Sequence, residues 1–301
     1  MNRRITLAAL GLAGAIAVAT PAVVSADLAA KPKPTPPPAD TGRAPADTAT
    51  ALANTGNEPR TGRFVVRCGF SHTAMDDPIV KPGQAGASHD HTFFGATTTD
   101  ADTTFDSLMA STTTCNDGAD HSAYWVPTLQ RNGVAVKPIR SSAYYLVGGR
   151  QASTIVAPPN GLKMVAGDSA HIRFACTARN EQGRGSATMP TSCPRGTNLV
   201  TRVVFPGCWD GLNLDSPDHR SHMAYSSAGA CPSTHPVAVP QIVLNVRWAT
   251  GGGSLSGVAF SSGDASTLHA DAFIAWDTAR LNELVTSCLN TGTKCKALPS
   301  R

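Results

Sequence analysis

The chain has 301 residues, of which 41% are hydrophobic and only 15% are charged, and its formal net charge is +4. This length suffices for one large domain or two small ones. Because the net charge is close to zero and no run of Lys and Arg tracks a groove, we expect no nucleic-acid partner.

Residues 1–26 have the features of a secretory signal peptide. Arg3 and Arg4 form a positive n-region, residues 5–20 are apolar, and residues 24–26 are a small-residue cleavage site. The alternative, a membrane anchor, is weaker because the apolar run is short for a bilayer. No other segment could span a membrane, so we expect an extracellular, secreted protein.

Residues 27–62 are rich in Pro, Ala and Thr and low in complexity. Such a composition cannot bury enough apolar surface to offset chain entropy, so we expect an extended, disordered spacer. It would hold a domain away from a wall or membrane surface, and the alternative is an idle or cleaved tail. A single disulfide-stabilised domain is then expected over residues 63–301.

The eight cysteines agree with export, because an even number in an exported protein favours disulfide bonds. No C-x-x-C pair occurs, which argues against a zinc ribbon. We expect sequential pairing, namely Cys68–Cys115, Cys176–Cys193, Cys208–Cys231 and Cys288–Cys295.

The region after residue 63 is composed mainly of predicted strands and turns. Strands are expected at 64–68, 124–129, 134–136, 142–147, 170–177, 198–205, 241–248, 258–260 and 268–274. The clearest alternation lies at 241–248, where Ile242, Leu244, Val246 and Trp248 face inward and Asn245 and Arg247 face outward. Asn132-Gly133 predicts a hairpin turn.

One helix is predicted, near the C-terminus. Asp277 suits its N-cap, and Leu281, Leu284, Val285 and Cys288 form an apolar stripe. Many short strands with one late helix predict a mainly β fold, an antiparallel β-sandwich or jelly-roll-like single domain with long loops. We expect this domain to be a monomer.

Two short stretches carry paired His and Asp side chains. His89 and His91 are two residues apart, so on a strand they share one face. His269 and Asp271 have the same spacing. Each pair suits two metal ligands or a base and its partner, and the alternative is local hydrogen bonding beneath a turn.

A longer stretch at 205–225 mixes aromatic, acidic and imidazole side chains. His219 and His222 are three residues apart and would share a face of a helical turn. Asp210 and Asp215 precede them, and Asp with His can bind a metal or share a proton. The alternative is a disulfide-clamped loop whose Asp residues cap turns.

We predict that these three stretches meet in one cleft. The candidate catalytic residues are His89, His91, Asp210, Asp215, His219, His222, His269 and Asp271. A divalent metal is a candidate cofactor, with His89, His91 and His222 as its ligands. Candidate substrate contacts are Asp120, Tyr124, Trp125 and Trp209, and for Trp209 the alternative is an ordinary core aromatic.

Other reaction classes are excluded by what the sequence lacks. The only glutamates are Glu58, Glu181 and Glu283, and none lies near the His and Asp stretches, so a Glu/Glu glycosidase pair is not expected. No G-x-S-x-G elbow, H-E-x-x-H motif, P-loop or G-x-G-x-x-G motif occurs.

The motifs together resemble a family of secreted proteins of unknown function, the domain-of-unknown-function family numbered nineteen ninety-six. The resemblance covers about residues 64–289 and rests on Asp77-Pro78-Ile79-Val80, Pro82-Gly83, Ser88 to Gly95, Tyr124 to Pro127, Phe205-Pro206, Cys208 to Gly211, Asp215 to Pro217 and His219 to His222. Members occur in bacteria and fungi, and some fungal members carry carbohydrate-binding WSC modules. The resemblance therefore implies a glycan-related role but no particular reaction.

Three functions are compatible with these observations. The first is a polysaccharide-active enzyme, a lyase or hydrolase, with a His/Asp site and a polysaccharide or cell-wall glycan as its partner. The second is a non-catalytic glycan-binding domain, and the third is a metal-dependent hydrolase of another substrate. We favour the first, because ionisable groups that converge in a cleft mark functional sites.

Overall fold

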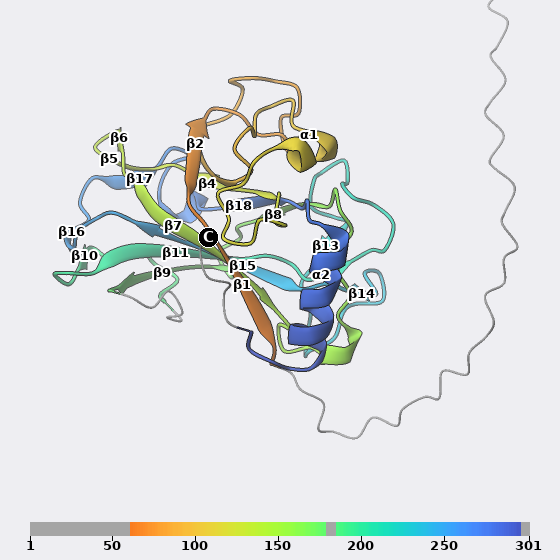
Figure 1. The fold of residues 1–301 in the computed structure, drawn as a ribbon. Coiled ribbons are helices and arrows are strands. Elements are labelled where there is room, and N and C mark those ends of the chain that lie inside the picture. The colour runs from red at the N-terminus through yellow and green to blue at the C-terminus, as the bar shows by residue number, and fades with distance from the viewer. Residues whose placement is uncertain (1–60, 179–184, 296–301) are drawn as a thin grey trace, which may run out of the picture. The chain divides into compact units, whose positions relative to one another are not determined.

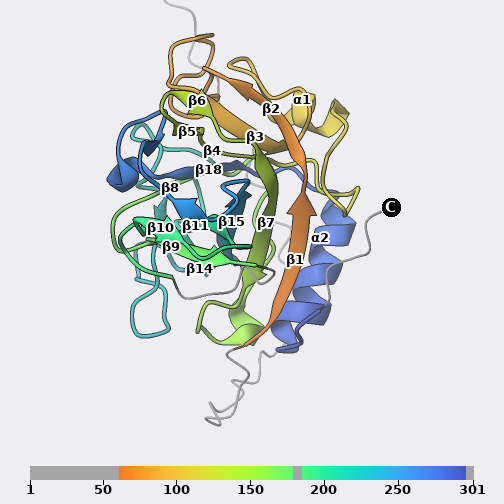
Figure 2. The same cartoon turned by 90° about the vertical axis from the view of Figure 1, so that its left-hand side faces the viewer.

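The computed structural model describes residues 61–178 and 185–295. The predicted signal peptide and residues 27–60 of the predicted spacer lie outside this part of the chain. The described residues form mainly antiparallel β structure, built from two larger sheets and three small ones (Figures 1 and 2).

Two five-stranded antiparallel sheets form the body of the domain. The first sheet has the spatial order β1 (Arg63–Cys68), β7 (Pro138–Leu146), β15 (Gln241–Trp248), β11 (Asn198–Val204) and β9 (Ile172–Thr177). The second has the order β2 (Phe70–Ala74), β3 (His91–Gly95), β4 (Ala123–Pro127), β18 (Ala270–Phe273) and β8 (Lys163–Ala166). Every pairing in both sheets is antiparallel.

Short strands complete the β structure. They form the sheets β17 (Val258–Phe260)–β5 (Leu129–Arg131)–β6 (Val134–Ala135), β13 (Met223–Ala224)–β12 (Cys208–Trp209)–β14 (Val237–Ala238), and β10 (Ser192–Cys193)–β16 (Gly253–Ser254). The predicted hairpin turn links β5 to β6, where Asn132 and Gly133 have φ values of 50° and 80°. Both values are positive, as a type I′ turn requires.

The main core lies between the two larger sheets. Alternate residues of each strand point inward, so one buried cluster contains Phe64 and Tyr145 from the first sheet and Phe94 and Tyr124 from the second. The rings of Phe64 and Tyr145 stack with centroids 4.5 Å apart. This packing of two antiparallel sheets confirms the predicted β-sandwich class. Asn245 lies on the face of β15 opposite to Leu244 and Val246, as predicted, but it is fully buried there.

The second sheet also buries part of its outer face. Phe93 and Trp125 on this face pack with Ile79 and with Leu108 of α1 (Phe105–Ala110). α1 was not predicted from the sequence, because its six residues are too few for a clear helical period. The loop that carries Ile79 and helix α1 thus cover this part of the outer face.

The predicted C-terminal helix is confirmed. α2 (Thr278–Leu284) begins at Asp277, whose carboxylate accepts a hydrogen bond from the Arg280 amide, and a π-helical segment continues it over Val285–Asn290. Leu281 and Leu284 are buried as expected. Figures 1 and 2 both show α2, in blue, alongside β1.

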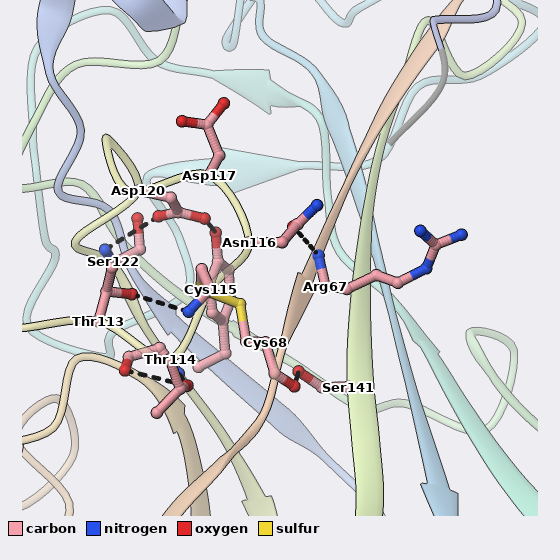
Figure 3. Close-up of a disulfide and its surroundings, with 12 residues drawn as sticks. Arg67, Cys68, Thr113, Thr114, Cys115, Asn116, Asp117, Asp120, Ser122 and Ser141 are labelled. Atoms are coloured by element: carbon pink, nitrogen blue, oxygen red, sulfur yellow. Dashed lines mark hydrogen bonds between the residues drawn. A yellow bond between two sulfur atoms is a disulfide. The ribbon is translucent and has the colours of Figure 1, made fainter. Parts of the chain in front are cut away.

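All four predicted disulfides are formed, so the sequential pairing is confirmed. Cys68–Cys115 ties the end of β1 to the loop before β4, as Figure 3 shows. Within residues 61–178 and 185–295, no helix has the length and apolar character needed to cross a membrane.

Candidate functional site

The candidate site lies on the outer face of the second sheet. β3 and β18 both pair with β4, and the register sets Phe93 and Asp271 on either side of Trp125. His91 is two residues from Phe93, so it shares this face. His91 and Asp271 are both fully buried, although both side chains are polar.

Three imidazoles converge at this point. The ring centroids of His89 and His91 are 4.2 Å apart, those of His89 and His269 are 5.0 Å apart, and those of His91 and His269 are 5.6 Å apart. One nitrogen from each ring lies within 4.8 Å of the other two. His269 comes directly before β18, so the strand that places Asp271 also places this imidazole.

Two carboxylates join the imidazoles. Asp77, Asp271 and His91 each offer one ligand atom, and these atoms lie within 4.8 Å of one another. Asp77 Oδ1 accepts hydrogen bonds from the amides of Ile79, at 3.0 Å, and Val80, at 2.9 Å. Neither carboxylate oxygen of Asp271 has a hydrogen-bond partner among the described residues, and the same is true of His89 Nε2. We call His89, His91, His269, Asp77 and Asp271 the His/Asp cluster.

Backbone carbonyls determine which nitrogen carries the proton in two of the rings. His91 Nδ1 lies 2.9 Å from the carbonyl oxygen of Asp76, and His269 Nδ1 lies 2.9 Å from that of Thr267. A carbonyl oxygen only accepts, so each Nδ1 must donate. In the neutral rings both Nε2 atoms therefore carry lone pairs, and these two atoms face each other at 3.3 Å.

Burial disfavours charge throughout the cluster. It lowers the pKa of His89 and His269, and it lowers the pKa of His91 to about 3. Burial also raises the pKa of Asp271 well above its ordinary value, and the nearby Asp77 adds to this rise whereas Arg220 opposes it. The imidazoles are thus held in the neutral form, which is the form that binds metal ions.

The cluster opens into a pocket of about 470 Å³. Asp77, His89, His269 and Asp271 line it, and Lys81 and Arg220 contribute positive charge to its wall. Gly167 allows the wall to close on His269, because a Cβ at this glycine would lie 2.5 Å from the His269 Cα, and its φ is +146°.

A second group lies outside the pocket lining and includes His219, the chain neighbour of Arg220. His219 Nδ1 is 2.9 Å from Asp215 Oδ1, and Lys163 Nζ is 3.4 Å from Asp215 Oδ2. His219 is close enough to Asp77 for its charge to lower the pKa of that carboxyl, although burial dominates and raises the pKa. His219 has a φ of 58°, so the predicted helical turn at 216–222 is instead a series of tight turns.

Two predicted catalytic residues lie apart from the cluster, with partners of their own. Asp210 accepts hydrogen bonds from the amides of Leu212, at 2.8 Å, and Asn213, at 2.9 Å, so it caps a turn. His222 is 1% exposed and is held through both ring nitrogens, by Ser216 Oγ at 2.8 Å and the Lys163 carbonyl oxygen at 2.6 Å.

The predicted metal set of His89, His91 and His222 differs from the group of histidines that the structure brings together. His222 has no ring nitrogen left for a metal, because both take part in the hydrogen bonds just described. His269 lies with His89 and His91 in its place. The spacing of His219 and His222 favoured a shared helical face, and the observed turns remove that face.

The predicted substrate contacts are mostly inaccessible. Asp120, Tyr124 and Trp125 are fully buried. The Tyr124 hydroxyl donates to Asp120 Oδ2 at 2.9 Å, and Figure 3 shows the Asp120 carboxylate close to the Cys68–Cys115 disulfide. Trp209 is partly buried against the main core, and its indole Nε1 donates to the Asn213 carbonyl oxygen at 2.6 Å. These residues support the fold rather than line the pocket.

Three charged residues of the pocket were missing from the sequence-based candidates. Asp77 appeared only in a motif of the family resemblance, and Lys81 and Arg220 were given no role. Asp77 precedes a proline, as residues in turns often do, and this signal hid its carboxylate. Only the contact between the 75–90 loop and the outer face of the sheet reveals its second role.

A protein-family model described as "Domain of unknown function (DUF1996)" matches residues 77–276. This range contains every residue of the His/Asp cluster, Arg220, and the His219–Asp215 pair. No curated protein and no solved structure matches the chain.

Proposed function

Since the chain belongs to the DUF1996 family, whose description assigns no activity, we propose from the geometry of the site that it is a secreted, metal-dependent enzyme. The His/Asp cluster would hold one divalent transition-metal ion at the floor of the pocket. The enzyme would cleave an extracellular polysaccharide by hydrolysis or elimination. The observation that carries this proposal is the 3.3 Å separation of His91 Nε2 and His269 Nε2.

Two lone pairs at this separation repel each other unless a cation lies between them. A proton could be shared, but burial lowers the pKa of both rings and so disfavours the imidazolium. A tetrahedral zinc site with Zn–N bonds of about 2.0–2.1 Å places two ligand nitrogens about 3.3–3.4 Å apart. The observed separation of 3.3 Å matches this expectation and so supports one ion bound by both rings.

The surroundings of the two rings support the same assignment. Metal-binding histidines commonly donate their second ring nitrogen to a carbonyl or carboxylate, which fixes the ring and the tautomer. His91 and His269 do so through the carbonyls of Asp76 and Thr267. The rings are therefore oriented for a metal by contacts that persist without it.

The carboxylates add a second line of support. Asp271 is fully buried and neither of its oxygens has a described hydrogen-bond partner. A buried polar group without a partner costs about 1–3 kcal/mol, and a charged one costs more. A cation in the cluster would remove this cost. Three imidazoles with one or two carboxylates also resemble the ligand sets of catalytic rather than structural zinc sites.

The pocket allows a coordinated ion to meet a substrate. A bound divalent ion would supply a nucleophilic water or stabilise negative charge on the substrate. His219 is suited to move the proton, because its Nδ1 donates to Asp215 and its Nε2 is left with a lone pair. Lys163 holds the other oxygen of Asp215 and steadies this pair.

The lining of the pocket argues against pure glycan binding. None of the residues that line it is Phe, Tyr or Trp or carries a side-chain amide, and these are the groups that sugar-binding sites use. A polysaccharide substrate is supported by the proposed secretion, with which the four disulfides agree, and by the glycan-related role that the family resemblance implies. The lack of Phe, Tyr and Trp also favours a second candidate, a metal-dependent hydrolase of a different extracellular substrate.

Metal analysis of the purified chain combined with an activity screen tests the proposal. We expect about one transition-metal ion per chain, and cleavage of one of a panel of plant and wall polysaccharides that a chelator stops and added metal restores. His171→Ala is the matched control, because His171 pairs with Asp168 outside the cluster. A protein without bound metal, or with activity that survives chelation, would contradict the metal assignment.

A further inference from the structure

We infer that the substrate enters the pocket through an anionic group, a carboxylate, sulfate or phosphate, which Arg220 and Lys81 bind beside the metal ion. This inference rests on the proposed function and adds the chemical class of the substrate. It depends on where the two cations lie, on what else they contact and on the charge of the filled site.

Arg220 is held on a pre-formed turn. The carboxylate of Asp218 accepts hydrogen bonds from Ser216 Oγ at 2.7 Å, from Ser221 N at 2.9 Å and from Ser221 Oγ at 2.8 Å. It also accepts from the Arg220 amide at 3.2 Å. These contacts fix the backbone from which Arg220 reaches the pocket that His269 and Asp271 line.

The side chains of Arg220 and Lys81 are free to bind a ligand. Both are exposed and line the pocket. Across residues 61–178 and 185–295, neither the guanidinium nor the ammonium makes an ion pair or a side-chain hydrogen bond. Lys163 differs, because it pairs with Asp215. The pocket thus retains two unneutralised cations close to the cluster.

The formal charges of the metal-loaded pocket determine whether it attracts an anion or a cation. The carboxylates of Asp77 and Asp271 carry two negative charges when ionised, and a divalent metal ion cancels them. A histidine that binds a metal ion does so as the neutral imidazole, so the three imidazoles of the cluster add no charge to the filled site. The positive charges of Arg220 and Lys81 therefore remain, so the metal-loaded pocket attracts an anion.

The side chains that line the pocket are also better suited to bind a ligand through charge than through stacking. Its apolar lining consists of small or aliphatic side chains such as Val80, Ala87 and Val165, which offer no stacking surface. Guanidinium groups bind carboxylate, sulfate or phosphate oxygens through paired, charge-assisted hydrogen bonds. An anion held there would lie within reach of the metal ion on the floor.

Cobalt-substituted protein provides the test, because the visible spectrum of Co²⁺ reports on its coordination. The full chain would be loaded with Co²⁺ and titrated with glucuronate, sulfate and phosphate, with glucose as the neutral probe. We expect at least one anion to change the spectrum saturably and glucose to leave it unchanged. Arg220→Gln should weaken the binding of that anion about tenfold or more, as expected for a lost charge-assisted hydrogen bond.

Matched variants separate the outcomes. Lys81→Gln should also weaken anion binding. Arg195→Gln, which removes an exposed arginine outside the pocket lining, should leave anion binding unchanged. The anion that binds most tightly identifies the substrate group. A normal cobalt spectrum that no anion changes, or equal anion binding by wild type and Arg220→Gln, would overturn this inference alone. Failure to bind cobalt would overturn the metal centre itself, and this inference with it.

Discussion

His91 and His269 lie 178 positions apart in the chain, yet their Nε2 atoms face each other at 3.3 Å on the outer face of one sheet. β4 brings them together, because it pairs with β3 on one side and with β18 on the other. Neither residue has a ring nitrogen that could relieve this contact, since each Nδ1 is committed to a backbone carbonyl.

Removal of either facing histidine should abolish stoichiometric metal binding. His269→Ala and His91→Ala should each weaken metal affinity by more than about tenfold, because even residues that only support ligands are worth 10–100-fold. His222→Ala should keep the metal, since both of its nitrogens bind protein groups. Calorimetric titration of each variant with zinc measures the effect. Metal lost in His222→Ala but kept in His269→Ala would show that the ligand set is wrong.

Gly167→Ala should disturb the cluster without changing any ligand. An added Cβ would lie 2.5 Å from the Cα and from the Cβ of His269, so one of the two chains must move. We expect a loss of about 1 kcal/mol or more in the free energy of unfolding, together with weaker metal binding.

Gly196→Ala is the control for this change. Gly196 also has a positive φ, +75°, but a Cβ there would meet nothing within 4 Å. It should lower stability by a similar backbone strain and leave metal affinity intact. Thermal unfolding and zinc titration of both variants measure the two effects, and unchanged metal affinity in Gly167→Ala would contradict the argument.

Asp120 should make the stability of the protein depend on pH. Burial raises its pKa to about 7, despite hydrogen bonds from Ser122 and Tyr124 that favour the ionised form. The folded protein therefore keeps a proton on Asp120 that the unfolded chain, with an ordinary value of 3.8, has released. The contribution of Asp120 to the free energy of unfolding is therefore fully present below pH 3.8. It decreases as the pH rises to about 7, by at most about 1.4 kcal/mol per pH unit.

Asp120→Asn should remove this contribution. The amide can still accept from the Ser122 backbone and contact the Tyr124 hydroxyl, so the local structure should persist. Denaturant unfolding between pH 4 and pH 7 would show a flatter dependence for Asp120→Asn than for wild type. Asp106→Asn, an exposed change on α1, should leave the slope unaltered. Identical slopes for wild type and Asp120→Asn would refute the pKa assignment.

The disulfides should differ in how much they stabilise the fold. Cys68–Cys115 spans a sequence separation of 47, whereas Cys288–Cys295 spans only 7. In the chain-entropy model the longer loop contributes about 4 kcal/mol and the shorter about 2 kcal/mol. Paired Cys→Ser variants of each disulfide, compared by denaturant unfolding, measure the difference. The opposite order would mean that residual structure or packing outweighs loop entropy.

Local patterns predicted the fold better than the site. The alternation at 241–248 reflects side chains that meet the core at every second position, so β15 could be recognised without knowledge of its neighbours. The histidine pairs at 89 and 91 and the His269–Asp271 pair were recognised for the same reason. Their convergence depends on strand order, which no local pattern encodes.

The errors have equally specific causes. A spacing of three favoured a helical face for His219 and His222, but the hydrogen bonds of Asp218 close a tight turn in which His219 has a φ of 58°. No right-handed helix contains such a residue. Trp125 was a candidate substrate contact, yet it packs against Ile79 of the loop above it and is fully buried.

The last prediction separates proton transfer from metal binding. His219 donates from Nδ1 to Asp215, so its Nε2 is free to take a proton from a substrate or water in the adjacent pocket. On the substrate that the activity screen identifies, His219→Ala should lower kcat about 10²-fold or more, a typical contribution of a general base. Its metal content should equal that of wild type, because His219 is not part of the His/Asp cluster.

Asp215→Asn completes this test. Loss of the carboxylate removes the group that orients His219, so kcat should fall by less than in His219→Ala while KM changes little. Combining the two changes should add little to His219→Ala alone, since both act through one imidazole. Fully additive losses, or a loss of metal in either variant, would show that His219 and Asp215 act separately or hold the ion, rather than move a proton as a pair.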